Sequence, residues 1–350
     1  MSITPNEAFA VKVMKIAVIG YGYWGPNLVR NFSWTPGVEV KYVCDLDPAR
    51  LAKVAGMFPN VEKTTTNLDE VLADPEVVAV AISTPVRSHY PIAKKALEAG
   101  KHVLVEKPMT DQVAHGKELC ELALSKGLVL MTDHTFLYTG AVRKIKELVD
   151  KGDLGELQYF DSMRVNLGLF QSDVNVIWDL APHDLSILLY LTDKKPKAVS
   201  AQGMAHVKGQ PENIAYMNVF FEDNLIAHFN VNWLSPIKVR QILIGGDKKM
   251  VLYNDMEMVE KVKVFDTGIF VEKPKEQVYQ ALVSYRTGDV YSPKLDGTEA
   301  LKAEIRHFLD CIEKKQTPIT DGRFGLLVVQ LLAAAQLSLE QGGTTITLEG

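Results

Sequence analysis

The chain has 350 residues, of which 47% are hydrophobic, and this length exceeds the usual size of one domain, about 100–200 residues. Its 38 basic and 43 acidic residues give a net charge of −5, which is small for this length and excludes the basic footprint of a nucleic-acid-binding protein. We therefore expect two domains and a small-molecule partner.

The cysteine content and the first residues indicate the cellular compartment. Cys44, Cys120 and Cys311 are widely spaced and fit neither a disulfide framework nor a zinc motif. Residues 1–15 lack the charged segment and long apolar stretch of a signal peptide, and no run of about 18 apolar residues occurs. We expect a cytoplasmic protein with reduced thiols, no metal and no membrane partner.

The first part of the chain, from Lys15 to Ala141, alternates short apolar runs with amphipathic stretches, as in βαβ units around a parallel sheet. Residues 89–100 and 111–127 are predicted helices that each end in a glycine. Residues 1–136 are thus predicted to form a Rossmann-type, doubly wound α/β domain. Its predicted strands are residues 15–20, 38–45, 77–84, 102–107 and 128–133.

From about Leu157 the pattern changes to long alternating segments separated by turn residues. Residues 137–350 are predicted to form an α+β domain for substrate binding and oligomerisation, with a largely antiparallel sheet, helices on one face, and a C-terminal helix that can pack back on the first domain. Because the other face needs cover, we expect self-association. The predicted strands are 157–168, 213–223, 225–235 and 239–255, and the predicted helices are 178–191, 299–313 and 326–340.

The motif GYGYWG directly follows the first predicted strand. Gly20 would allow the tight turn, Gly22 a close approach of backbone to a pyrophosphate, and Gly25 close packing of helix on strand. Tyr23 and Trp24 occupy the permissive positions. An isolated GxGxxG is a weak signal, but a strand before it and a helix N-terminus after it favour a dinucleotide site.

An acidic residue follows the second predicted strand. Asp45 lies 20 residues beyond Gly25, the spacing of the acid that bonds the adenine ribose. A carboxylate there repels a 2′-phosphate, so NAD is favoured over NADP, for which Arg50 would supply the phosphate partner. Asp47, which precedes Pro48, is the better N-cap of the next helix, and this leaves Asp45 for the ribose.

Ligands of open parallel sheets collect beyond the carboxyl ends of the strands. Lys107 is the strongest candidate there because it follows a strand directly, although a lysine at such a position is usually only a solvated charge. The other residues that we expect at this edge are Ser83, Thr84, Pro85, His89, Glu106, Asp133 and His134.

Three segments together resemble the Gfo/Idh/MocA family of sugar and polyol oxidoreductases over nearly the whole chain: GYGYWG, STPVRSHYPIAKKALEAGKHVLVEKP and WDLAPHDLSILLYL. The resemblance implies that Lys107 lies beside the reacting carbon and that a cis peptide bond precedes Pro108. It also implies that Thr84, Pro85 and His89 line the cofactor.

The last of these segments carries a carboxylate followed four residues later by a histidine, here Asp179 and His183, which would share one helix face. Pro182 cannot continue a helix that began a full turn earlier, so we place it in the first turn or at a kink. With the family's chemistry, His183 would accept the hydroxyl proton and Lys107 would orient the hydroxyl, or the two would exchange these roles. Asp179 would orient the lysine or bind a neighbouring hydroxyl.

The substrate is predicted from polar groups of the second domain together with the resemblance to family members that oxidise nucleotide-linked sugars. We expect oxidation at C3 of a UDP-linked amino sugar or uronate, by a homodimer or homotetramer. The alternatives are a free sugar or inositol-type polyol, a non-catalytic NAD-binding regulator, and a cycle in which bound NADH returns its hydride. The candidate substrate-binding residues, besides Asp179 and His183, are His134, Tyr138, Arg164, Asn166, Lys238 and Arg240.

Overall fold

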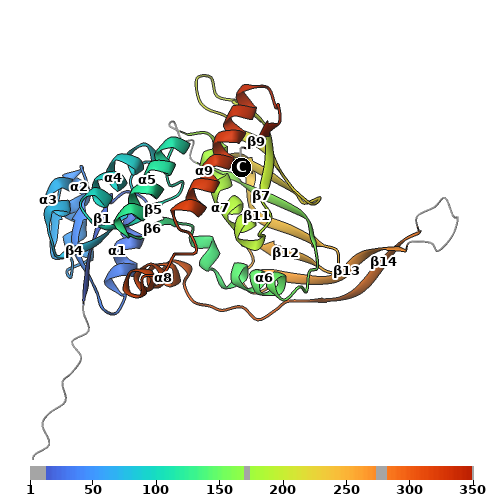
Figure 1. Ribbon diagram of the computed structural model, residues 1–350, viewed down its shortest axis with the longest axis horizontal. Helices are drawn as coiled ribbons and strands as arrows, with labels where there is room; N and C mark the ends of the chain where they lie inside the picture. The colour runs from blue at the N-terminus through green and yellow to red at the C-terminus, as the bar shows by residue number, and fades with distance from the viewer. Residues whose placement is uncertain (1–12, 169–173, 273–281, 349–350) are drawn as a thin grey trace, which may run out of the picture. The chain divides into compact units, whose positions relative to one another are not determined.

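The computed structural model describes residues 13–168, 174–272 and 282–348 (Figure 1). The chain divides into two compact units. Met1–Asp133 and Leu301–Leu326 form the first unit, and His134–Ala300 and Leu327–Gly350 form the second. The boundary predicted from the sequence was between residues 136 and 137, and it grouped residues 301–326 with the second domain. Each unit is described below by itself.

The first unit contains a parallel sheet in the order β3-β2-β1-β4-β5-β6, which is typical of dinucleotide-binding folds. Consecutive residues of β1, β4 and β6 are buried, because helices cover both faces of the sheet. This confirms the predicted doubly wound fold. The strands are β1 (Met14–Ile19), β2 (Val38–Cys44), β3 (Lys63–Thr65), β4 (Val77–Ile82), β5 (His102–Glu106) and β6 (Leu130–Asp133).

Local sequence signals explain where the helices of this unit begin and end. Asp47 caps α2 by accepting from the Ala49 N–H at 2.8 Å, as predicted, and Gly127 ends α5 in the left-handed conformation. The short β3 and α3 were not among the predicted elements. The helices are α1 (Gly25–Ser33), α2 (Pro48–Met57), α3 (Leu68–Ala73), η1 (Val86–Ser88), α4 (His89–Glu98), α5 (Val113–Lys126) and α8 (Ala300–Lys314).

The second unit contains a nine-stranded sheet in the order β14-β13-β12-β11-β7-β10-β9-β8-β15. Neighbouring strands are antiparallel except β7 and β10, which are parallel, so the prediction of a largely antiparallel sheet is confirmed. The predicted strand 239–255 is in fact two strands, because residues 247–249 form a turn. The strands are β7 (Leu157–Leu167), β8 (Pro196–Met204), β9 (Ile214–Phe221), β10 (Ile226–Asn232), β11 (Leu234–Gly246), β12 (Met250–Asn254), β13 (Val262–Glu272), β14 (Leu282–Tyr291) and β15 (Ile346–Thr347).

Helices cover one face of this sheet. α7 packs on β7, β9 and β10, and α6 packs on α7 (Figure 1). On the opposite face, Met163, Tyr216, Ile226 and Leu243 are 40–47% exposed. Self-association through this face, as a homodimer or homotetramer, stays a prediction. The helical elements are η2 (Thr135–Tyr138), α6 (Gly140–Asp150) and α7 (Val176–Leu191), together with α9 (Gly322–Glu340), in which the division between the units falls.

One helix in the described part of the chain, α9, is long and apolar enough to cross a membrane by length and composition. Half of its most apolar window is buried within the fold, as in a core helix. Ser338, near its end, is fully buried and accepts from the Ala201 N–H at 2.8 Å. This packing in the protein interior makes α9 weak evidence for a membrane span.

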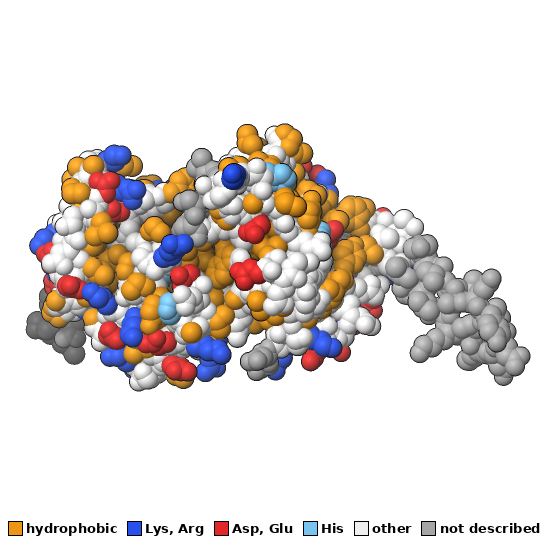
Figure 2. Space-filling view, turned by 90° about the horizontal axis from the view of Figure 1, so that it is seen from above, with side chains coloured by type: hydrophobic (Ala, Val, Ile, Leu, Met, Phe, Trp, Pro, Cys, Tyr) orange, Lys and Arg blue, Asp and Glu red, His pale blue; other side chains and the backbone are white. Residues whose placement is uncertain are grey.

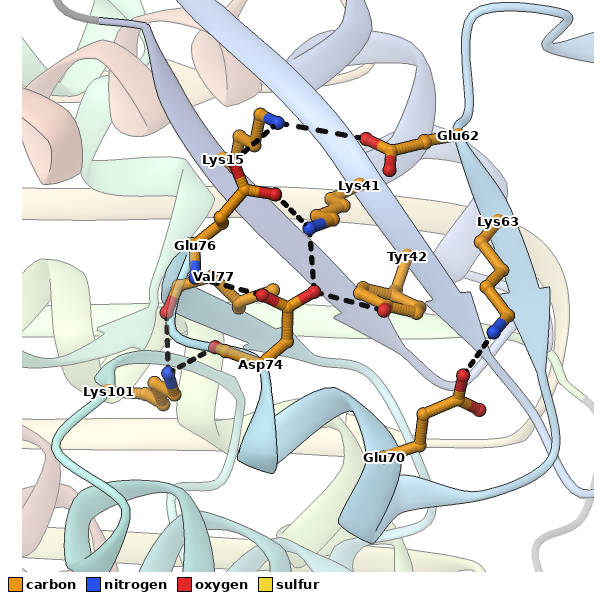
Figure 3. A network of polar contacts seen from close by, with 10 residues as sticks. All are labelled: Lys15, Lys41, Tyr42, Glu62, Lys63, Glu70, Asp74, Glu76, Val77 and Lys101. Atoms are coloured by element: carbon orange, nitrogen blue, oxygen red, sulfur yellow. Dashed lines mark hydrogen bonds and ion pairs between the residues drawn. The ribbon is translucent and has the colours of Figure 1, made fainter.

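Acidic and basic side chains lie interspersed over the first unit on the face drawn in Figure 2. A network of such residues lies near the amino-terminal end of the parallel sheet (Figure 3). Asp74 accepts from Lys41 Nζ at 2.7 Å, from the Tyr42 hydroxyl at 3.0 Å and from the Glu76 N–H at 2.9 Å. Lys101 is 6% exposed and donates to the carbonyl of Asp74 at 2.7 Å. The network ties β2 and β5 to the turn before β4.

The pairing with Lys41 lowers the pKa of Asp74 to about 2. A carboxylate with a lowered pKa stabilises the fold above its unfolded pKa of about 3.9, and this stability is lost as the pH falls towards the folded value. We expect Asp74→Asn to lower the free energy of unfolding by about 1.5–3 kcal/mol near neutral pH. The difference from wild type should shrink below about pH 4 and vanish near the folded pKa.

Urea unfolding monitored at several pH values measures this difference. Asp69→Asn is a matched control, because Asp69 pairs with Lys95 at 3.1 Å but its side chain is 75% exposed. An equal, pH-independent loss in both variants would contradict the role given to Asp74.

Candidate functional site

In the glycine loop of the first unit, backbone atoms pack directly against other backbone atoms. Gly20 has a φ of +94°, and a Cβ there would lie 2.7 Å from the carbonyl oxygen of Ser83. A Cβ at Gly25 would lie 2.3 Å from the carbonyl oxygen of Gly20. Side chains are therefore excluded at both positions, in agreement with the roles predicted for a tight turn and for close helix packing.

Gly22 differs from its two neighbours. A Cβ there would meet only Arg50 Nη1, at 3.6 Å, which is an ordinary contact. The fold itself therefore does not require a glycine at this position, whereas a ligand approaching the backbone would. Pro26 lies in the first turn of α1, so the helix begins directly behind the loop and its N-terminus can receive an anion. The loop thus fits the pyrophosphate of a dinucleotide.

Asp45 at the end of β2 is 9% exposed and supports the loop. Its carboxylate accepts from the Tyr21 N–H at 2.6 Å and from the Asp47 N–H at 2.8 Å. Arg50 Nη1 lies 3.6 Å from the same carboxylate. Each carboxylate oxygen can accept more than one hydrogen bond, so Asp45 can also receive a ribose hydroxyl. Tyr23, in the glycine loop, is 95% exposed.

The residues after β4 are tied to the loop and to the segment after β5. The Ser83 hydroxyl donates to the Gly20 carbonyl at 2.9 Å, and the Ser88 hydroxyl donates to the Thr84 hydroxyl at 2.8 Å. His89 is 1% exposed, and its ring nitrogens lie 2.7 Å from the Thr84 carbonyl and 2.9 Å from the Pro108 carbonyl. Burial lowers the pKa of His89. Contact of Thr84, Pro85 or His89 with the cofactor stays a prediction.

The segment after β5 carries Glu106 and Lys107. The peptide bond between Lys107 and Pro108 is cis, as the family resemblance implies. The Lys107 N–H donates to Glu106 Oε2 at 2.9 Å, and Asp133 on the neighbouring strand β6 accepts from the indole of Trp24 at 2.9 Å. Trp24, at a loop position where the motif accepts any residue, therefore contacts the carboxyl edge of the sheet.

In the second unit, α7 carries Asp179 and His183. Asn175 caps the helix by accepting from the N–H groups of Ile177 and Trp178 at 3.1 and 3.2 Å. The helix therefore begins before the predicted start at Trp178, and Pro182 lies inside it. The first-turn placement of Pro182 was wrong, because Asn175 starts the helix earlier than the apolar pattern indicated.

Asp179 and His183 lie four residues apart in this single helix and thus on one face. The indole of Trp233, which is 1% exposed, donates to Asp179 Oδ2 at 3.0 Å. The His183 ring meets that of Phe136 edge-on, with centroids 5.1 Å apart. Neither Trp233 nor Phe136 was singled out from the sequence, since each reads as an ordinary core aromatic.

Arg164 on β7 is engaged within the protein. It is 4% exposed, and its Nε and Nη2 donate to Asp184 at 2.9 and 2.6 Å. The Ser162 hydroxyl donates to the same carboxylate at 2.7 Å. The Arg164 guanidinium lies 4.6 Å from the centre of the Phe136 ring. Arg164 therefore packs against Phe136, whose ring contacts His183. Contact of Arg164 with a substrate stays a prediction.

The other predicted substrate residues differ in exposure. His134 and Tyr138 are 1% and 2% exposed, and Arg143 lies 5.0 Å from the centre of the Tyr138 ring. Arg240 pairs with Asp255 at 3.2 Å. Asn166 is half-buried and Lys238 is exposed. The structure thus brings His183, Arg164 and Arg240 together around Phe136, whereas Lys238 lies at the surface.

Breaking a buried ion pair leaves an uncompensated charge, which costs about 3–5 kcal/mol. We expect Asp184→Ala to lower the free energy of unfolding by about this amount, because Arg164 would stay buried. Asp161→Ala is the control, since Asp161 pairs with His228 at 2.9 Å but has a half-exposed side chain. Chemical unfolding of both variants tests this, and equal small losses would refute the structural weight given to the pair.

Comparison with protein families assigns both parts of the chain. Residues 14–134 match the oxidoreductase family with an NAD-binding Rossmann fold, and residues 142–252 match the GFO/IDH/MocA C-terminal domain. An uncharacterized oxidoreductase of Schizosaccharomyces pombe, C26H5.09c, is 39% identical over 43% of this chain and 43% of its own length. The scyllo-inositol 2-dehydrogenase (NADP+) IolW of Bacillus subtilis is 27% identical over 67% of this chain. The chain spans 43% and 63% of the lengths of these two relatives.

Solved structures share the fold over nearly the whole chain. UDP-N-acetylglucosamine 3-dehydrogenase GnnA from Acidithiobacillus ferrooxidans is 24% identical, with a TM-score of 0.75 over 94% of this chain and 98% of that protein. GenD2 from gentamicin A biosynthesis, solved in complex with NAD, is 22% identical, with a TM-score of 0.81 over the full length of both chains. At these identities the likeness shows a common fold.

Proposed function

Because the chain belongs to the Gfo/Idh/MocA family of oxidoreductases, we propose that it is an NAD-dependent dehydrogenase that oxidises a secondary hydroxyl of a sugar. The observation that carries this proposal is α7, which presents Asp179 and His183 on one face with the Asp179 carboxylate fixed by Trp233. A carboxylate and a histidine one helical turn apart can bind a hydroxyl and accept its proton. The matched Rossmann domain supplies the cofactor site.

Residues of the first unit would hold the dinucleotide. The loop from Gly20 to Gly25 and the N-terminus of α1 would receive the pyrophosphate, and Asp45 would receive the adenine ribose. Nicotinamide, when bound, accepts a hydride from the substrate carbon. The Asp45 carboxylate supports NAD as the cofactor, whereas the NADP dependence in the name of IolW and the nearby Arg50 support the alternative.

Three side chains would carry the proton chemistry. His183 would accept the hydroxyl proton, and Lys107 would orient the hydroxyl and stabilise the developing alkoxide, or the two would exchange roles. Asp179, held by the Trp233 indole, would bind a neighbouring hydroxyl or orient the lysine. These roles follow from the match of both motifs to the family pattern.

For the substrate, we propose oxidation at C3 of a UDP-linked amino sugar or uronate. The likeness to GnnA, named as a UDP-N-acetylglucosamine 3-dehydrogenase, and the exposed Lys238 support an anionic, nucleotide-linked sugar. The second candidate is a polyol of the inositol type, which the name of IolW favours. The pairing of Arg164 and Arg240 with protein carboxylates also favours a substrate with less charge.

We expect Lys107→Ala and His183→Ala each to lower kcat by about two to four orders of magnitude, the contribution typical of general acid–base catalysis. Binding of the cofactor, followed by calorimetry, should persist in both variants, because the glycine loop and Asp45 are unchanged. Near-normal turnover in both would refute the assignment. If the wild type bound the cofactor but turned over no substrate, the result would instead favour a non-catalytic regulator.

A panel of UDP-sugars, free sugars and inositols, with NAD and with NADP, separates the substrate candidates by absorbance of the reduced cofactor. We expect a UDP-linked amino sugar with NAD to give the highest kcat/KM. A highest value with an inositol would establish the second candidate. Turnover of substrate without accumulation of NADH would show a cycle in which the hydride is returned.

A further inference from the structure

Two carboxyl side chains lie side by side at the carboxyl edge of the parallel sheet in the first unit. Glu106 ends β5, Asp133 ends β6, and the two residues are direct partners in the strand register. Two ionised carboxylates on neighbouring strands offer only acceptors and repel each other, so this arrangement favours a proton on one of the two.

The neighbouring donors decide which carboxyl holds the proton. Asp133 is 3% exposed and accepts at 2.9 Å from the indole N–H of Trp24, which can only donate. Burial and the charge of Asp133 raise the pKa of Glu106 well above its usual range, against the lowering effect of Lys107. A proton is therefore favoured on Glu106.

The position of this pair relates it to one half of the cofactor. Asp45, at the end of β2, marks the adenosine side, and the glycine loop follows β1 in the middle of the sheet. A dinucleotide that crosses the loop therefore directs its nicotinamide half towards β4, β5 and β6. Trp24 links the loop directly to Asp133 on that side. Oxidised nicotinamide carries a positive charge that the reduced ring lacks.

We propose that Glu106 and Asp133 form a proton-binding site linked to the oxidation state of the cofactor. This site holds its proton more tightly beside NADH than beside NAD+. This inference rests on the proposed function. A nearby positive charge favours the deprotonated pair, and its loss favours the protonated pair. The two cofactors have nearly the same shape, so desolvation by either is similar and the difference in charge decides the sign.

The step balances with the proposed reaction. The C–H bond of the alcohol breaks with its electron pair going to nicotinamide, and the O–H proton goes to the side chain that acts as base. A deprotonated Glu106–Asp133 pair then takes up one further proton from the solvent as the positive charge disappears. Within the part of the chain that the structure describes, the charged groups that act on Glu106 are Asp133 on β6 and Lys107 on its own segment, and the Trp24 indole donates to Asp133.

Binding of NAD+ and of NADH, each measured by calorimetry from about pH 5 to about pH 9, tests the linkage. In the wild type, the affinity ratio of NAD+ to NADH should rise with pH, by up to about tenfold per pH unit where the pair titrates. In Glu106→Gln, which cannot ionise, the ratio should not change with pH. Glu118→Gln is the matched control, because Glu118 on α5 pairs with Lys94 at 2.6 Å, and it should behave as wild type.

Infrared spectroscopy gives a second readout that does not depend on turnover. The wild type minus Glu106→Gln difference spectrum should contain a protonated carboxyl band with NADH, and this band should weaken with NAD+. In Asp133→Asn the pH dependence of the affinity ratio should move to lower pH, because the neighbouring negative charge is gone. If Glu106→Gln does not fold, Asp133→Asn and the wild-type spectrum test the proposal in its place.

The outcomes separate the two proposals. A pH-independent affinity ratio in the wild type, or the same dependence in Glu106→Gln, would overturn the linked proton site while leaving the dehydrogenase intact. Failure of the wild type to bind either cofactor would overturn the proposed function, and with it this inference.

Discussion

The close packing of the glycine loop against the end of β4 is the constraint on which the rest of the first unit depends. Gly25 lies so near the Gly20 carbonyl, and Gly20 so near the Ser83 carbonyl, that no side chain fits at either glycine. The helix α1 therefore begins directly behind β1, and its N-terminus lies at the carboxyl edge of the sheet. An anionic ligand and the residues after β4, β5 and β6 are thereby brought to the same edge.

Both units fix an acidic residue with a tryptophan. Trp24 donates to Asp133 at 2.9 Å in the first unit, and Trp233 donates to Asp179 at 3.0 Å in the second. An indole N–H is only a donor, so it holds a carboxylate oxygen in one orientation. A lysine or an arginine would hold the carboxylate equally well but would add a charge. The indole leaves each acidic residue able to act on other charges nearby.

The second unit supports its functional helix from behind with buried ionic and aromatic contacts. Arg164 donates to Asp184, and the neighbouring Phe136 ring contacts His183. The guanidinium carbon of Arg240 lies 5.8 Å from the centre of the same Phe136 ring. Such a set of contacts restricts the rotation of side chains that must stay in place during a reaction. Arg164 and Arg240 are thus engaged within the protein, whereas Lys238 lies at the surface.

The sequence by itself determined the features that depend on local periodicity and spacing. The parallel order of βαβ units, the glycine loop, the Asp47 cap and the spacing of Asp179 and His183 all follow from residues close together in the chain, because strand alternation, turn geometry and helical periods are local properties. The family motifs added the cis bond before Pro108, which the structure confirms.

The tertiary structure decided which distant side chains meet. The partner of Arg164 is Asp184 and the partner of Asp179 is Trp233, and no local pattern marks either pair. The neighbouring positions of Glu106 and Asp133 likewise depend on the register between β5 and β6, which is set by the packing of the whole sheet. Of the two placements predicted for Pro182, the first turn was wrong, because Asn175 caps α7 before the start that the apolar pattern indicated.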